Sequence, residues 1–290
     1  MRRLPPCYTI ARDKIPGRVM TFLHSALEAD ANGIPDASPA MIRAQCRADS
    51  LSAAREIVRA KIERELEATV QDKATRHLRL AEWETRIGAT RTVAELLIVE
   101  AKAAADYWRG FADRGLREAK GGNLPRTWLR FANRQKGAGF LGSKNASHPI
   151  NAMLNYAYVV EAGRLAKALA ARGLALQIGY LHSDKTGRNS LVWDAIEPLR
   201  PIIDAKVFRY LEGREFKRLD FVQTSASTYR LERDIITELL TKASLPRAEI
   251  DDAADFMPRI IERHSGAQGL FKADGRKRAR ALPELVPGIE

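Results

Sequence analysis

The sequence predicts a mainly α-helical protein in which a large all-helical domain follows a small N-terminal module. Three segments carry this prediction, because their apolar residues recur every three to four positions, as on one face of a helix. They are residues 50–70, 92–111 and 149–173. With 290 residues, 45% of them apolar, the chain is long enough to bury the core of one large or two ordinary domains.

The first 45 residues form the expected N-terminal module. Prolines and glycines interrupt the chain up to residue 39 and prevent long elements, while Cys7–Ile10 and Val19–Leu23 could be short β-strands. We therefore expect a reduced β module over residues 1–45 and a helical domain over 46–265. Residues 266–290 are basic and then proline-containing, which is typical of a tail that stays flexible until it binds a partner.

Start and stop signals delimit the helices. Thr92 and Glu95 are spaced as a capping box at the start of the second helix. The third begins near Pro149, which suits a first-turn position, and ends at Gly173. Ser190 can cap a fourth helix that reaches about residue 199. Further helices are expected over residues 202–211, 231–242 and 253–263.

The charge balance favours a polyanionic partner. Lys and Arg number 48 against 36 Asp and Glu, a formal net charge of +12, which points to nucleic acid before an anionic membrane surface. No apolar run approaches the ~18 residues of a membrane span, and the first residues lack the apolar core of a signal peptide. Two cysteines are too few for a disulfide framework, so we expect a cytoplasmic protein.

Several common chemistries have no motif in this sequence. It contains no Gly-x-Ser-x-Gly elbow, no phosphate loop ending in Gly-Lys-Ser/Thr and no Cys-x-x-Cys pair. Hydrolysis by a serine nucleophile, nucleotide binding by a phosphate loop and a zinc ribbon therefore lack support.

Residues 113–148 form a basic, glycine-rich stretch. Its cations include Arg126, Arg130 and Arg134, and the aromatic residues Trp128, Phe131 and Phe140 lie among them. One interpretation is a solvated loop that a few aromatic side chains pin to the core. The other is a flexible segment that contacts the backbone of a nucleic acid and stacks on its bases.

The residues most indicative of chemistry lie between positions 179 and 204. His182 precedes a basic loop with Lys185 and Arg188, and Asp194 and Glu197 follow three residues apart, on one face of a helix. An imidazole and carboxylates are ligands for a divalent metal, and the cations could hold phosphates. The alternatives are a hydrogen-bonded core histidine and the polar face of an amphipathic helix.

Two further carboxylates lie among apolar residues. Glu100 falls on the apolar stripe of the second helix, three and four positions after Leu97 and Leu96. A charge there must be paired or bound to a metal, so an ion pair with a cation of a neighbouring helix is the alternative to a ligand role. Glu161 is interpreted as structural.

Three segments together resemble the CRISPR-associated spacer-acquisition integrase family. They are Glu100–Phe111 (EAKAAADYWRGF), Pro149–Tyr158 (PINAMLNYAY) and Gly179–Asp204, which joins GYLH to DAIEPLRPIID. Residues 55–62 also resemble the helix that precedes the family's catalytic region, so the match covers roughly residues 40–240. The part before it is shorter than the β-sheet domain with which members of that family usually begin, and we expect an atypical member.

The resemblance implies a metal-dependent DNA integrase or endonuclease that inserts DNA with 3′-hydroxyl ends by transesterification. Its metal ligands would be Glu100, His182 and Glu197, with Asp194 as the accompanying acid, and the ion would be Mg²⁺ or Mn²⁺. Lys185, Arg188 and Arg200 would contact phosphates. The implied partners are double-stranded DNA, as spacer precursor and as repeat-like target, a second copy of the chain in a homodimer, and a small adaptation subunit; no membrane is involved.

Two alternatives stay open. A casposase-like transposon integrase of the same superfamily shares these active-site residues and differs in genomic neighbourhood. A non-catalytic, basic helical DNA-binding protein would lack one acid of the metal set, and here none is missing.

Overall fold

The computed structural model describes residues 37–111, 113–131, 146–184, 187–224, 228–267 and 269. This part of the chain is mainly helical, as predicted. The helices are α2 (Pro39–Arg47), α3 (Ser50–Thr69), α4 (Lys73–Gly88), α5 (Val93–Arg109), α6 (Pro149–Ala170), α7 (Ser190–Ala195), α8 (Arg200–Glu212), α9 (Arg233–Ala243) and α10 (Arg247–Ser265). Single 3-10 turns are η3 (Arg126–Trp128), η4 (Glu197–Leu199) and η5 (Arg218–Asp220).

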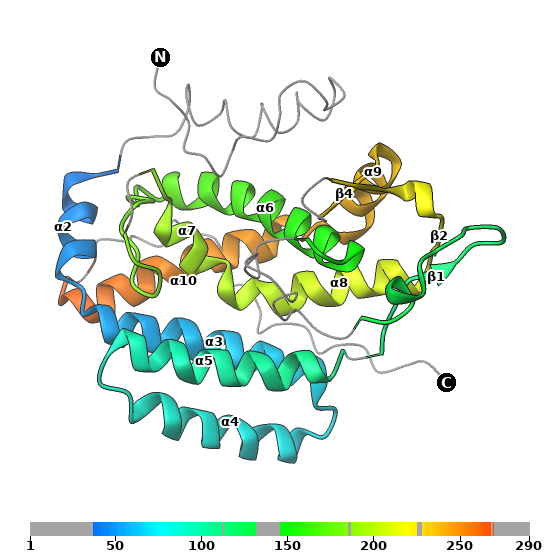
Figure 1. The fold of residues 1–290 in the computed structure, drawn as a ribbon. Coiled ribbons are helices and arrows are strands. Elements are labelled where there is room, and N and C mark those ends of the chain that lie inside the picture. The colour runs from blue at the N-terminus through cyan, green and yellow to red at the C-terminus, as the bar shows by residue number, and fades with distance from the viewer. Residues whose placement is uncertain are drawn as a thin grey trace.

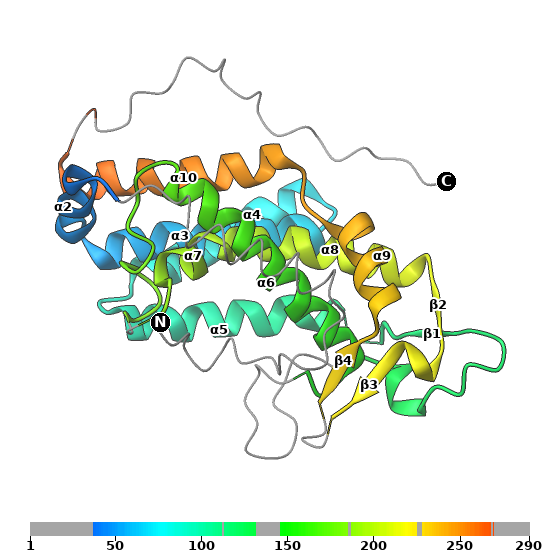
Figure 2. The same ribbon diagram turned by 90° about the horizontal axis from the view of Figure 1, so that it is seen from above.

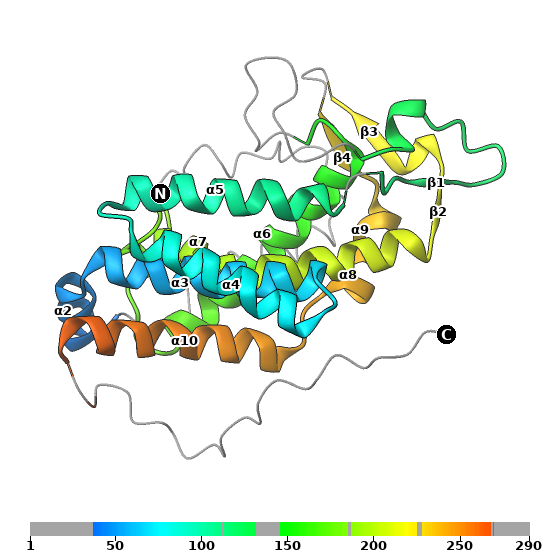
Figure 3. The same ribbon diagram turned by 90° about the horizontal axis from the view of Figure 1, so that it is seen from below.

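Helix α3 lies at the centre of the helical body. It packs against α4, α5, α7, α8, α10 and η4. In Figure 1, α6 covers one side of α7, α8 and α10, while α3 and α5 lie on the other side and α4 is outermost. Views from above and below place α3 between α5 and α10 (Figures 2 and 3). Side chains of α3 therefore reach the contacts between several helices.

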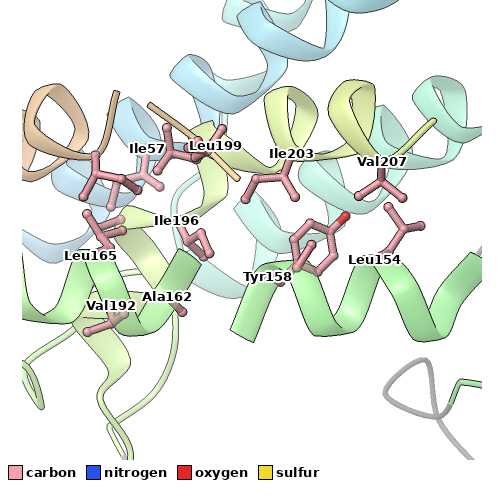
Figure 4. Packing of buried hydrophobic residues seen from close by; sticks show 14 of the residues in the cluster. Ile57, Leu154, Tyr158, Ala162, Leu165, Val192, Ile196, Leu199, Ile203 and Val207 are labelled. Atoms are coloured by element: carbon pink, nitrogen blue, oxygen red, sulfur yellow. The ribbon is translucent and has the colours of Figure 1, made fainter. Parts of the chain in front are cut away.

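Helix α6 forms much of the core, because apolar residues cover nearly all of its surface. Leu154, Tyr158 and Leu165 of α6 face Ile196 and the residues of α8, as Figure 4 shows. The helix begins at Pro149 after His148, whose Nδ1 accepts a hydrogen bond from the amide of residue 150 at 3.1 Å. Burial lowers the pKa of His148 to about 4, so its ring is neutral and can accept this bond.

The helix expected from Ser190 to about residue 199 is divided. Helix α7 ends at Ala195, η4 follows, and α8 begins at Arg200. Pro198 and Pro201 have no amide hydrogen and cannot continue the α-helical hydrogen-bond pattern. The hydroxyl of Ser190 does not cap the helix but donates to the carbonyl of Ser183 at 3.1 Å. The break brings Glu197 to a turn between two helices.

The expected capping box at α5 is half formed. The Thr92 side chain accepts from the amide of Glu95 at 3.2 Å, as predicted. The Glu95 carboxylate instead accepts from the amide of Arg91 at 2.7 Å, one residue before the expected donor.

Helix α4 and four short strands are present although the sequence did not indicate them. Of α4 only Trp83 and Ile87 are buried, so it carries little apolar periodicity. β1 (Arg117–Glu118) pairs in parallel with β2 (Glu215–Phe216), and β3 (Phe221–Gln223) pairs antiparallel with β4 (Tyr229–Leu231). Strands of two or three residues are too short to show alternation. The expectation of an entirely helical body was therefore wrong in this detail, and the mainly α fold class holds.

The expected strands at residues 7–10 and 19–23 lie outside the described residues, as does nearly all of the expected tail. Helix α2 crosses the expected boundary at residue 45 and packs against α10. No helix in the described part of the chain is long and apolar enough to cross a membrane.

We expect Leu165→Ala to destabilise the protein much more than Val159→Ala, although both truncate an apolar residue of α6. Leu165 is fully buried, and removing such a side chain costs about 2–5 kcal/mol through lost burial and a cavity. Val159 is 46% exposed, so its truncation should change the free energy of unfolding by less than about 0.5 kcal/mol. Urea denaturation measures both, and equal losses would contradict the packing described for α6.

Candidate active site

The loop that carries His182 is held by the carboxylate of Asp194 on α7. Asp194 is fully buried; its Oδ2 accepts from the amides of Tyr180 (2.5 Å) and Leu181 (3.1 Å). Its Oδ1 accepts from the amide of His182 at 2.9 Å and lies 2.7 Å from that residue's Nδ1. The carboxylate thereby fixes the imidazole ring and leaves Nε2 as the nitrogen that can bind a ligand.

Two further residues position this loop. Gly179 is needed because a Cβ there would lie 2.7 Å from the Cβ of Ser190 and 3.0 Å from Oδ2 of Asp194. The buried amide of Gln45 donates to the carbonyl of Ala175 (3.0 Å) and accepts from its amide (2.8 Å). The Tyr180 hydroxyl donates to the carbonyl of Gln45 at 3.1 Å. The loop is thus fastened to both α2 and α7.

Glu197 faces the other side of His182. Its side chain is only 7% exposed, and Oε1 lies 4.0 Å from Nε2 of His182. The same oxygen lies 3.0 Å from Nε of Arg200 without hydrogen-bond alignment, so this contact is an ion pair. Burial alone would raise the pKa of Glu197, but Arg200 and Lys61 outweigh it and lower the pKa to about 2. Glu197 is therefore ionised at neutral pH.

Lys61 of α3 joins Glu197 to Glu100 of α5. Its ammonium group donates to Oε2 of Glu197 at 2.7 Å and also to Oε1 of Glu100. The side chain of Lys61 is 10% exposed and that of Glu100 19% exposed. Burial alone would lower the pKa of Lys61, but the two carboxylates outweigh it and raise the pKa above the ordinary value. A charged ammonium therefore lies between two carboxylates.

The three expected metal ligands come from α5, the 179–182 loop and η4. Glu100 and Glu197 bond to Lys61, and Nε2 of His182 lies 4.0 Å from Oε1 of Glu197. Among the described residues, no three His, Cys, Asp or Glu side chains converge closely enough to hold an ion in this arrangement. The donor set nevertheless fits one: a cation already lies between the two carboxylates, and the imidazole presents Nε2 to Glu197. A divalent ion would have to take the place of the ammonium group.

Two expected site residues have different surroundings from those that the sequence suggested. Asp194 uses both oxygens for the loop and His182, which leaves no free oxygen for a second ion. Arg200 was expected to contact phosphates, but its guanidinium pairs with Glu197 and lies 4.8 Å from the ring centre of Tyr158. Both residues therefore act on the proposed ligands themselves.

The remaining cations are distributed over several parts of the surface. Arg188 is half-buried after the loop, Arg126 is exposed on η3, and Arg130 is exposed and pairs with Asp113. Lys185 and Arg134 lie outside the described residues. Trp128 and Phe131 are buried, which agrees with a loop that aromatic side chains pin to the core.

The structure gives Glu161 the structural role expected for it. Its carboxylate accepts from the amide of Leu245 at 3.0 Å and from Arg164 at 2.7 Å, which ties α6 to the α9–α10 connection.

Three charged residues of this region were given no role of their own from the sequence. Lys61 and Glu65 belong to the apolar face of α3, where a charge among Ile57, Val58 and Ile62 was an available signal. Asp204 of α8 accepts hydrogen bonds from the hydroxyls of Tyr107 (3.1 Å) and Tyr158. Its two partners come from distant segments, so no local pattern indicates them.

The fold is shared with a casposase and with Cas1 proteins whose structures are solved. A casposase bound to an integration product superposes with a TM-score of 0.59 and 21% identity, over 85% of this chain and 69% of that one. A Cas1 protein from Thermotoga maritima superposes with a TM-score of 0.56 and 17% identity, over 76% of this chain and 66% of that one. A chain of a Cas6-RT-Cas1–Cas2 complex superposes with a TM-score of 0.58 and 17% identity, over 80% of this chain and 26% of that one. These likenesses define the fold.

The sequence profile described as "CRISPR associated protein Cas1" matches residues 28–244, more than half of the chain. The protein therefore belongs to the Cas1 family, as the sequence resemblance predicted.

Curated relatives agree with this assignment. A CRISPR-associated endonuclease Cas1 of Pyrobaculum aerophilum is 30% identical over 63% of this chain and 59% of that protein. A Cas4/Cas1 fusion of Rhodospirillum rubrum is 33% identical over 58% of this chain and 29% of that protein. The chain thus spans less than two thirds of the length of these relatives.

We expect Glu65→Gln to remove a loss of stability that the wild type shows between about pH 4.5 and pH 8. Burial raises the pKa of Glu65 from 4.5 to about 8, because the loss of hydration outweighs the attraction of the Lys61 charge. The protonated carboxyl thus stabilises the fold fully below pH 4.5, and this stabilisation is lost as the pH rises through about 8. Over that range the wild type should lose up to ~1.4 kcal/mol per pH unit relative to Glu65→Gln.

Urea unfolding in EDTA across this pH range measures the difference. Glu63→Gln, at a 43% exposed position of the same helix, is the matched control and should keep the wild-type slope. Parallel pH profiles for wild type and Glu65→Gln would contradict the burial of an uncharged carboxyl there.

Proposed function

We propose that this protein is a metal-dependent DNA integrase that joins 3′-hydroxyl DNA ends to a target strand, as in CRISPR spacer acquisition. One observation carries the proposal: Glu100 and Glu197 bond to one cation between α3, α5 and η4, and Nε2 of His182 lies 4.0 Å from Oε1 of Glu197. Membership of the Cas1 family supports it. The acids and the imidazole are the three ligands that the family resemblance implies.

The proposed reaction is a transesterification. The oxygen of an incoming 3′-hydroxyl attacks a phosphorus of the target strand and loses its proton, and the bond from that phosphorus to the target's own 3′-oxygen breaks. One phosphodiester forms as one is lost, so the step needs no nucleotide cofactor. Mg²⁺ or Mn²⁺, held by Glu100, His182 and Glu197, would polarise the phosphate and stabilise the leaving oxygen.

The surrounding residues fix these ligands. Asp194 holds the His182 ring through Nδ1, so that Nε2 points at Glu197. Arg200 holds Glu197 from the side opposite Lys61 and contributes positive charge next to the place where a phosphate would lie. Such outer contacts raise the basicity of a ligand and fix its orientation.

Double-stranded DNA is the proposed partner, both as spacer precursor and as repeat-like target. The net charge of +12 favours it, and Arg126 and Arg188 are candidates for phosphate contacts. Contacts to phosphates position a duplex without reading its sequence, so we expect recognition of ends or bends. A homodimer and a small adaptation subunit are further proposals; the second is supported by the fold likeness to a Cas1–Cas2 complex.

A casposase-like transposon integrase is the second candidate. The casposase superposes on this chain as well as the Cas1 structures do, with a TM-score of 0.59. The curated relatives named Cas1 favour the CRISPR function. A repeat array and a gene for a small partner beside this gene would decide for spacer acquisition, and terminal inverted repeats for transposition.

We expect Glu197→Gln and His182→Ala to lower strand transfer by more than about 100-fold, since each removes a proposed metal ligand. The assay uses a labelled short duplex with free 3′-hydroxyls, supercoiled plasmid and Mn²⁺, with and without a candidate partner subunit. Glu82→Gln, at an exposed position of α4, is the control and should keep wild-type activity. Undiminished joining by Glu197→Gln would refute the proposed site. DNA binding by the wild type without any joining, partner included, would favour a non-catalytic DNA-binding protein.

We also expect Arg188→Ala to weaken DNA binding and to reduce its salt dependence. Each lost phosphate contact should lower the slope of log K against log salt by roughly 0.9. Fluorescence anisotropy of a labelled duplex at several salt concentrations measures this slope. Arg259→Ala, at an exposed position of α10, is the control and should leave the slope unchanged. Equal slopes for wild type and Arg188→Ala would remove Arg188 from the DNA-binding surface.

A further inference from the structure

The position of Lys61 is unusual for a lysine. It lies on the buried face of α3, next to Ile57, Val58 and Ile62, and its ammonium group bonds to carboxylates of two other segments. No step of the proposed reaction uses it. It nevertheless lies where the proposed metal ion would have to bind.

We propose that Lys61 is the internal counter-cation of the active site: it holds Glu100 and Glu197 in place before a divalent ion arrives, and the ion displaces its ammonium group. Lys61 is thus a positioning residue that competes with the metal. The inference rests on the proposed function, because it takes Glu100 and Glu197 as metal ligands.

The electrostatics of the acid pair require such a cation. Two carboxylates that are 19% and 7% exposed lose most of their hydration, so each charge is costly unless a cation pairs with it. Arg200 pairs with Glu197 through Oε1, and within the described part of the chain no ion pair joins it to Glu100. Lys61 bonds to Oε2 of Glu197 and to Glu100, and so is the cation that links the two acids. Without it, two poorly hydrated carboxylates would lose the positive charge to which both of them bond.

The chemistry of lysine suits a cation that can be displaced. Its ammonium is a compact charge on a flexible four-carbon stem, whereas a guanidinium binds as a rigid fork. Glu65 lies one turn further along the same face of α3 and is buried. Its carboxyl group could accept a hydrogen bond from the displaced ammonium, which would then stay buried with a partner.

Lys61→Met tests the proposal, since it keeps the length of the side chain and removes its charge. In EDTA the variant should melt at a lower temperature than the wild type, because the acid pair has lost its counter-cation. It should bind Mn²⁺ more tightly, by roughly 5- to 150-fold, since the ion no longer displaces an ammonium. Isothermal titration calorimetry with MnCl₂ alone measures the affinity. Lys102→Met, at an exposed position of α5, is the matched control and should resemble the wild type in both measurements.

A double mutant separates the proposed role from a merely structural one. In the Glu197→Gln background one acid is already neutral, so Lys61→Met should lower the melting temperature much less than in the wild type. This comparison also serves if Lys61→Met alone fails to fold, because the double mutant should then recover folding.

The outcomes distinguish this inference from the proposed function. In one outcome, Glu197→Gln abolishes Mn²⁺ binding, while Lys61→Met binds Mn²⁺ no more tightly than the wild type. This result would overturn the role of Lys61 and leave the metal site standing. If Lys61→Met lowers the melting temperature equally in the wild-type and Glu197→Gln backgrounds, that role is also overturned. Mn²⁺ binding that is unaffected by Glu197→Gln would instead overturn the metal site, and the inference with it.

Discussion

The arrangement of the candidate active site depends on one constraint: the side chains of Glu100 and Glu197 are only 19% and 7% exposed, and carboxylates with so little hydration need a cation beside them. Lys61 meets that need in the structure, through bonds to both carboxylates. It can do so because α3 runs through the centre of the fold, in contact with both α5 and η4. The helical body therefore brings acids from distant parts of the sequence to the Lys61 ammonium group on the apolar face of α3.

The other features of the site position Glu197 and His182, two of the proposed ligands. Glu197 reaches the Lys61 ammonium group because Pro198 and Pro201 end the regular α-helix and leave a 3-10 turn there. His182 turns its Nε2 toward Glu197 because Asp194 binds three amides of its loop and its Nδ1. Asp194 and Arg200 hence support the proposed ligands from outside, through the loop of His182 and through the ion pair with Glu197.

Much of the fold could be predicted from the sequence, because long helices with a buried stripe leave a strong periodic signal. The limits of α3, α5 and α6 agree with the expected ones to within a few residues. Helix α4 was missed because it buries only two residues, and the break after Ala195 because apolar spacing continues through the prolines. Of the site, Glu100 was recognisable as a charge on an apolar stripe. That Lys61 would be its partner depends on the packing of α3 against α5, which no local pattern encodes.

The most direct test of the account is a crystal structure of the protein soaked in Mn²⁺, with the ion located by its anomalous scattering. The account predicts an ion bound by Glu100, Glu197 and Nε2 of His182, at ligand distances of about 2.0–2.3 Å, with the Lys61 ammonium moved out of the gap. Manganese bound elsewhere, or Lys61 still bridging the two carboxylates at full Mn²⁺ occupancy, would contradict it.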